Sequence, residues 1–295
     1  MKISLFENAM DSVDHAIEHL KNGKEKKSNY DYKQALLSMF HGSELLLKQL
    51  LYLKNPIYIF DKNSLYKNCL DFMNPTNEEL LNCKSLDMKD LAREVSKYYS
   101  NSFTKNNLER IINDAAKERN KLQHFTTNTA EKDVVSIILK LYHKVISPSL
   151  KIIGNSQPYD SNDQYLKILN NIFSFEENAN KTEKILDIEG NSFRRMICHE
   201  CGQYSLFTLY EDNSGYPTSY YCTCCDNKMD SISTDDYFLC PDCDFWTLVY
   251  NSDLMGGICL NESCCSNKDG GVVIDMEYCA NCQSYKIEEI CHCNK

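Results

Sequence analysis

The sequence lacks any apolar run of the ~18 residues or more that a membrane-spanning helix needs. Its first residues, M-K-I-S-L-F-E-N, place an acidic side chain at Glu7 and contain no apolar stretch of signal-peptide length. We therefore expect a protein that is not secreted, has no membrane partner and acts in the cytoplasm.

Cysteine is scarce in the first half of the chain, and basic residues are scarce in the second half. Of 16 cysteines, only Cys69 and Cys83 lie in residues 1–150, and the other 14 lie between Cys198 and Cys293. Residues 1–150 carry 22 Lys and Arg against 19 Asp and Glu, whereas residues 151–295 carry 10 against 23, which together give the net charge of -10. Such contrast predicts a helical bundle over 1–153, a helical connector over 154–196 and a cysteine-rich region over 197–295.

The cysteines of the second half are spaced as metal-binding knuckles. In a reducing compartment, repeated C-x2-C pairs are typical of metal sites rather than of disulfides. Zinc takes four thiolate or imidazole ligands in a tetrahedron, and two knuckles on a strand pair supply them. The sequence thus predicts small β zinc ribbons with about three structural zinc ions per chain. Sequential pairing assigns Cys198, Cys201, Cys222 and Cys225 to the first site, Cys240, Cys243, Cys259 and Cys264 to the second, and Cys279, Cys282, Cys291 and Cys293 to the third.

Some ligand choices stay open. Cys224 competes with its cysteine neighbours in the first site, Cys265 competes with Cys264, and His292 competes with the cysteines beside it. An arrangement that interleaves the first two sites is a further alternative. The β-prone stretches 205–210 and 218–221 predict a hairpin between the first two knuckles. Gly202 suits a tight turn after the first knuckle.

The zinc sites are expected to be structural. Four thiolates close the coordination sphere, whereas a catalytic zinc keeps one position open for water. A surface as acidic as that of residues 151–295 repels phosphate, so we expect no DNA partner. Holding a dimer together or binding a protein partner suits these ribbons better.

Apolar residues in the first half recur every three or four positions, which is typical of amphipathic helices. Thr76 and Glu79 form a capping-box pattern, Asp87 is a candidate cap, and a helix is expected from about Thr104 to Phe125. Short connections between the helices favour antiparallel neighbours, so the fold class is mainly α, an up-and-down bundle followed by β modules. In the connector, the polar stretch 176–180 is expected to be a loop.

Residues 119–124 read R-N-K-L-Q-H, with Arg119, Asn120 and His124 as the chemically informative positions. This resembles the signature of the HEPN superfamily of helical-bundle ribonucleases, an Arg and a His separated by a few residues of which the first is polar. The segment from His41 to Lys48 is similar to the second helix of many HEPN domains, which has an E-L-L-L-K core. The resemblance covers roughly residues 1–150 and leaves the ribbons outside.

The residue types suit RNA cleavage without a metal. A histidine with its ordinary pKa of about 6.5 can donate or accept a proton near neutrality, and a guanidinium offers two donors to a phosphate. On a helix, positions five apart diverge by about 140°, so one copy of Arg119 and His124 does not form a compact site. Asn120 and His124 do share a face.

The resemblance to HEPN ribonucleases implies a homodimer in which two motifs meet in one cleft. It implies that RNA is cut to a 2′,3′-cyclic phosphate, with His124 moving protons, Arg119 holding the scissile phosphate and Asn120 orienting one of them. No cofactor is implied for catalysis. It implies an enzyme of toxin or defence type, for which an antitoxin partner is expected. The alternative is a non-catalytic HEPN scaffold that binds a protein partner through its zinc ribbons.

Overall fold

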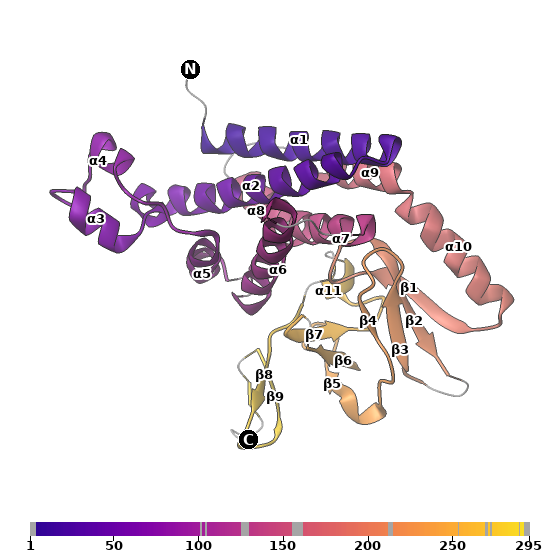
Figure 1. The fold of residues 1–295 in the computed structure, drawn as a ribbon. Coiled ribbons are helices and arrows are strands. Elements are labelled where there is room, and N and C mark those ends of the chain that lie inside the picture. Colours follow the sequence, from indigo (N-terminus) through magenta and orange to yellow (C-terminus); the bar gives the residue numbers. More distant parts are fainter. Residues whose placement is uncertain are drawn as a thin grey trace. The chain divides into compact units, whose positions relative to one another are not determined.

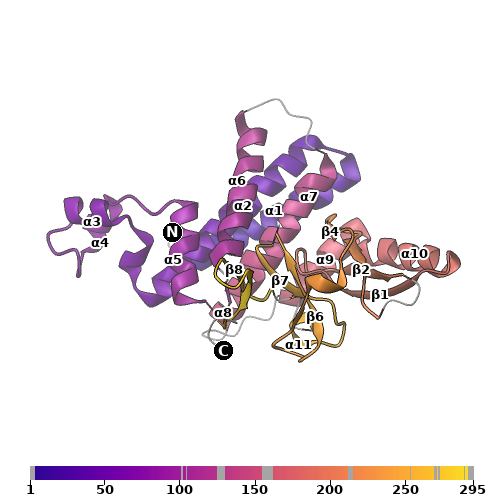
Figure 2. The same ribbon diagram turned by 90° about the horizontal axis from the view of Figure 1, so that it is seen from below.

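The protein is mainly α-helical, and its small antiparallel sheets all lie in the C-terminal part, as expected from the sequence (Figures 1 and 2). The computed structural model describes residues 4–100, 102–103, 105–124, 130–154, 162–211, 215–252, 254–268, 271, 273–288 and 290–291. The chain divides into two compact units, residues 1–166 and 167–295. No helix within the described ranges has the length and apolar character to cross a membrane.

Helix α2 is the centre of the first unit and contacts α1, α5, α6, α7 and α8. It is buried on several sides, which explains its apolar side chains from Tyr32 to Leu51. At Gly42 the backbones of α1 and α2 approach so closely that a Cβ would lie 2.9 Å from Val13 Cγ2. The long helices of this unit are α1 (Leu5–Lys26), α2 (Asn29–Lys54), α5 (Met88–Tyr98), α6 (Lys105–His124), α7 (Glu131–Leu141) and α8 (Ser147–Gly154).

A short excursion separates α2 from α5. It contains the 3-10 turn η1 (Pro56–Ile59), α3 (Lys62–Asn68) and α4 (Asn77–Leu81), and a bridge between Phe60 and Ser85 closes its base. The capping box predicted at Thr76 and Glu79 is confirmed, as is the Asp87 cap of α5. The helix predicted from about Thr104 is α6, although Phe125 lies outside the described residues.

A π-helical turn, η2 (Tyr142–Ile146), joins α7 to α8 without a break. Pro148 lies two residues after this turn ends, and proline has no amide hydrogen and crowds the carbonyl four residues before it. Widening the helix relieves that clash, so the Ser147 amide donates to the carbonyl of Tyr142, five residues back. Apolar periodicity alone does not reveal this turn.

In the second unit, helix α10 (Phe175–Ile188) covers a four-stranded antiparallel sheet. Ala179 and Leu186 of α10 pack on Phe207 of the sheet. Helix α9 (Asn162–Phe173) precedes α10, and Ser174 with φ 53° forms the corner. The loop predicted for residues 176–180 is wrong, because their polar side chains form only the exposed face of α10 while Phe175 and Ala179 anchor the other.

The strands of this unit form three small antiparallel sheets, the four-stranded sheet under α10 and two smaller ones. The predicted hairpin is confirmed as the pair of β2 and β3. The Tyr237 hydroxyl donates to the Pro217 carbonyl, and the Asn251 amide donates to the Tyr220 hydroxyl, so the first two sheets are joined. The strands are β1 (Ser192–Ile197), β2 (Tyr204–Tyr210), β3 (Ser219–Cys222), β4 (Lys228–Met229), β5 (Tyr237–Leu239), β6 (Trp246–Asn251), β7 (Gly256–Cys259), β8 (Met276–Cys279) and β9 (Ser284–Ile287).

Candidate metal centres and the Arg119 helix end

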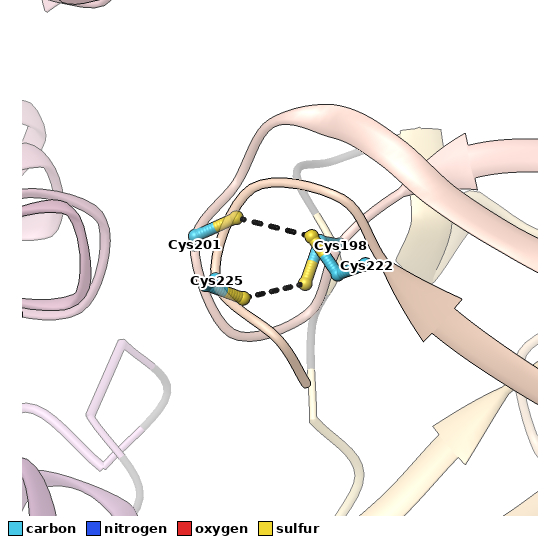
Figure 3. A group of neighbouring side chains, drawn as sticks. All are labelled: Cys198, Cys201, Cys222 and Cys225. Atoms are coloured by element: carbon cyan, nitrogen blue, oxygen red, sulfur yellow. Dashed lines mark hydrogen bonds between the residues drawn. The ribbon is translucent and has the colours of Figure 1, made fainter. Parts of the chain in front are cut away.

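The first candidate metal centre is a cluster of four buried cysteines, Cys198, Cys201, Cys222 and Cys225 (Figure 3). The β1–β2 connection supplies two, and the end of β3 with the following turn supplies the others. Sulfur atoms of Cys198 and Cys225 are 3.6 Å apart, and those of Cys201 and Cys222 are 3.8 Å apart. A tetrahedron with zinc–sulfur bonds of about 2.3 Å has edges of about 3.8 Å, so the cluster fits one such ion.

The backbone of each knuckle is bent by a residue in the left-handed region directly after its second cysteine. Gly202 (φ 70°) occupies this position in the first knuckle, as predicted, and Asp226, Asp244 and Gln283 occupy it in the others. In the first knuckle the Cys198 amide donates to the Gln203 carbonyl over 2.8 Å. These hydrogen bonds fold the turn around the thiols.

Amide groups inside the knuckles point at sulfur. The Glu200 amide lies 3.4 Å from Cys198 Sγ, and the Cys224 amide lies 3.4 Å from Cys222 Sγ. Such donors favour the thiolate form that binds metal. The knuckles therefore have the electrostatics of ligand-bearing turns rather than of ordinary hairpins.

The second centre gathers Cys240, Cys243, Cys259 and Cys264. The sulfur atoms of Cys240 and Cys264 are 3.8 Å apart, as are those of Cys243 and Cys259. Three of these cysteines are buried and Cys243 is half-buried. Leu248, Ile274 and Met276 pack around the cluster, so it lies inside the small core of this ribbon.

The first two centres are structural repeats, 42 residues apart in the sequence. In each, the strand after the knuckle carries a bulge one residue before a buried leucine, at Ser205 and at Thr247. The Ser205 hydroxyl lies 3.2 Å from Cys222 Sγ, and the Thr247 hydroxyl lies 3.2 Å from Cys259 Sγ. A bulge re-aims a side chain, and here it brings a hydroxyl to hydrogen-bonding distance of a candidate ligand sulfur.

These two hydroxyl groups lie against candidate ligand sulfurs, at positions that cysteine spacing alone does not reveal. The available signal is the repeat itself, C-x2-C-x3-[ST]-L, which starts at Cys198 and again at Cys240. Ser266 is a third case, with its hydroxyl 3.0 Å from Cys264 Sγ. Hydroxyl donors around ligand sulfurs tune metal affinity.

The third group contains Cys279, Cys282 and Cys291, with 3.6 Å between the sulfur atoms of the last two. The strand pair of β8 and β9 carries this knuckle. The predicted fourth ligand, Cys293, and its alternative His292 lie outside the described residues. The structure therefore brings together three of the four thiols predicted for the third metal site.

The other alternative ligands lie beside the first two clusters. Cys224 is buried next to the first cluster but is not among its four sulfur atoms. Cys265 is exposed, with its thiol 3.6 Å from the Asp242 carbonyl. The grouping is sequential, and the first two clusters are not interleaved.

Four thiolates this close together would repel one another, and a bound cation would stabilise them. Burial raises the pKa of the Cys201 thiol, whereas hydrogen bonds from Cys198 and its neighbours lower the pKa of the Cys222 thiol. In the second cluster, burial raises the pKa of Cys264 to about 11. Adjacent thiolates repel one another, so full deprotonation of a cluster needs a metal ion between the sulfur atoms.

Arg119 lies on α6 and is held by two contacts. Its guanidinium carbon is 4.7 Å from the ring centroid of Phe40 on α2. Its Nε and Nη2 atoms donate to Asn120 Oδ1 over 3.2 Å and 2.8 Å. The side chain is therefore oriented by an aromatic ring from one side and by an amide from another.

The structure brings two of the three predicted site residues together. Asn120 is exposed and its side chain binds Arg119. His124 is the last residue of α6, and its side chain lies outside the described part of the chain. On α2, one turn beyond Phe40, Glu44 and Lys48 form a half-buried ion pair of 2.7 Å. The two segments that carry the HEPN resemblance are thus linked through Phe40 and Arg119.

No family model, curated protein or solved structure matches this chain.

Proposed function

We propose that the protein is a metal-independent endoribonuclease of toxin or defence type, with an HEPN-like up-and-down bundle and structural zinc ribbons. The observation that supports this proposal most is the orientation of the Arg119 guanidinium by Phe40 and Asn120. Arg119 lies on α6, the helix that ends at His124. An oriented guanidinium suits a phosphate, since less side-chain entropy is lost when it binds. Arg119, Asn120 and His124 of two protomers line one cleft in this proposal.

The chemistry needs only protons and a clamp. The 2′-oxygen of a ribose attacks the adjacent phosphorus, the bond to the 5′-oxygen breaks, and a cyclic phosphate remains. His124 moves the proton that one of these oxygens loses or gains, and Arg119 holds the charged oxygens of the phosphate. Asn120 keeps the Arg119 fork aimed through the hydrogen bonds that it accepts.

The two four-cysteine clusters support zinc as the resident metal of the ribbons, and the third group of three thiols brings the expected count to about three ions per chain. Four thiolates leave no position for water, so the metal supplies folding rather than chemistry. Elemental analysis of purified protein measures the count. A metal-free protein with disulfide-linked cysteines would contradict this part of the proposal.

The deciding experiment compares wild type with His124→Ala and with Gln123→Ala, an exposed neighbour on the same helix. Each protein is incubated briefly with total RNA in EDTA, and the fragment ends are examined for cyclic phosphate. We expect cleavage by wild type and Gln123→Ala and none by His124→Ala, with the same dimer mass for all three. Equal cleavage by all three would refute the assignment.

A second candidate function is a non-catalytic scaffold that binds a protein partner through its ribbons. The exposed Trp246 on the acidic second ribbon favours it. Absence of RNA cleavage by every variant, together with binding at that ribbon, would favour the scaffold over the nuclease.

A further inference from the structure

The second ribbon has an exposed apolar surface of unusual composition. Phe245 and Trp246 are 61% and 57% exposed, and Leu239 is 43% exposed. Leu239 and Trp246 are directly opposed on β5 and β6, so their side chains leave the same face of the sheet. The bulge at Thr247 explains the exposure, because it turns Trp246 outward while Leu248 stays buried.

Acidic residues lie beside these apolar side chains, and two acidic groups near the ends of the segment 229–267, Asp230 and Glu262, pair with Lys228 and Arg194. Asp242 and Asp244 are both exposed and lie just before Phe245 in the sequence. From residue 229 to residue 267 the sequence contains seven Asp and Glu and no Lys or Arg. Four thiolates around one divalent zinc add a formal charge of about -2. We use the name Trp246 surface for the patch formed by Leu239, Asp242, Asp244, Phe245 and Trp246.

The structural repeat shows what such an aromatic residue contacts in this protein. Tyr204 of the first ribbon occupies the position of Trp246, directly before the bulge, and is 56% exposed. The Arg195 guanidinium lies 4.7 Å from the Tyr204 ring centroid and donates to the Tyr204 carbonyl over 2.9 Å. In the first ribbon, therefore, the chain itself supplies a cation to the aromatic face.

The second ribbon does not supply that cation. The position of Arg195 is taken by Tyr237, which is buried. Among the residues that the structure describes, no Lys or Arg lies over the Trp246 ring. Tryptophan is the strongest aromatic acceptor for a cation, and it dominates many protein interfaces.

We propose that the Trp246 surface binds an arginine-containing basic segment of a protein partner. One arginine of the partner stacks on Trp246 as Arg195 stacks on Tyr204, and Asp242 and Asp244 pair with the neighbouring basic groups. Apolar side chains of the segment cover Leu239 and Phe245. A nucleic acid does not suit this surface, because its phosphates would face the aspartates. The inference holds whether or not the helical unit cleaves RNA.

Trp246 is the single tryptophan of the chain, so its emission reports on this surface alone. The probe is a short labelled peptide that alternates arginine with leucine, titrated into the full-length, zinc-loaded protein. Matched probes carry citrulline, which is neutral, or glutamate in place of each arginine, and a single-stranded RNA is the fourth. We expect only the arginine peptide to change the Trp246 emission, with binding that weakens at high salt.

Variants are compared by anisotropy of the labelled peptide. Trp246→Ala should weaken binding about tenfold, since aromatic interface residues often contribute that much. Asp242→Asn combined with Asp244→Asn should also weaken it and reduce its salt dependence, and asparagine tolerates the left-handed backbone at residue 244. Tyr30→Ala, at an 84% exposed aromatic residue of the other unit, is the control. Unchanged zinc content shows that each variant is folded.

Several results would overturn the proposal. These are equal binding of the arginine and citrulline peptides, wild-type binding by Trp246→Ala, or no binding of the arginine peptide. A response to RNA alone would make the surface a nucleic-acid site instead.

Discussion

Removal of one thiolate from the first centre should unfold its ribbon and leave the helical unit intact. The change is Cys198→Ser, which takes one sulfur from the four in Figure 3. The sheet packed on α10 buries few large apolar side chains, chiefly Met196, Leu206, Phe207 and Tyr220. Burial of four such side chains contributes about 6–12 kcal/mol. A structural zinc contributes about 10–16 kcal/mol, and conformational entropy opposes the burial, so the ribbon does not stay folded once the metal is lost.

Hydrogen exchange measured by mass spectrometry tests this. We expect amide protection in β2 and β3 to fall by at least about 100-fold, since every 1.4 kcal/mol is a factor of ten. Amides of α2, whose core is separate, should keep their protection, and the zinc content should fall by one ion per chain. The control is Cys224→Ser, a buried cysteine beside the cluster that is not one of its four sulfurs. Retained protection and zinc in Cys198→Ser, or equal losses in Cys224→Ser, would refute the reasoning.

Three further predictions concern the turns and caps around the sites. Ser205→Ala and Thr247→Val each remove a hydroxyl group that lies against a candidate ligand sulfur. We expect zinc affinity, measured by competition with a chromogenic chelator, to fall about 10–100-fold. An unchanged affinity would show that the hydroxyls play no part. Gly202→Val should lower the melting temperature of the ribbon more than Gly202→Asn, because valine at φ 70° costs about 1–2 kcal/mol more, and equal melting temperatures would contradict this. Hydrogen bonds, chiefly from the Leu70 amide, lower the pKa of Glu79, so its contribution is present above the ordinary carboxyl pKa and is lost as pH falls through the lowered value. Exchange protection of residues 60–85 should show this acid sensitivity in wild type and lose it in Glu79→Gln.

Local patterns of the sequence were sufficient where a short segment determines its own conformation. The capping box at Thr76 and Glu79 and the hairpin of β2 and β3 follow from neighbouring side chains and turn residues. The turn at Gly202 follows from the need for a positive φ. Each of these features depends on interactions within a few residues, which is why the sequence reveals them.

Local polarity misled at residues 176–180, which belong to α10. Four polar residues among these five positions predict a loop, but the helix needs only one apolar side, and Phe175, Ala179 and Leu186 provide it. The π-helical turn at Tyr142 is a similar case, since Pro148 causes it while the apolar period continues through it.

The sequence by itself predicted which thiols of the first two clusters come together, because cysteine spacing fixes which thiols can reach one ion. It also determined the helical character of the first half and marked Arg119, Asn120 and His124 as the residues suited to phosphate chemistry. Tertiary structure alone decided that Phe40 lies under the Arg119 guanidinium, since those two residues are brought together by the packing of α2 on α6. It likewise decided that Trp246 faces solvent, because a bulge formed by strand pairing, rather than the polarity of the residue, sets its direction.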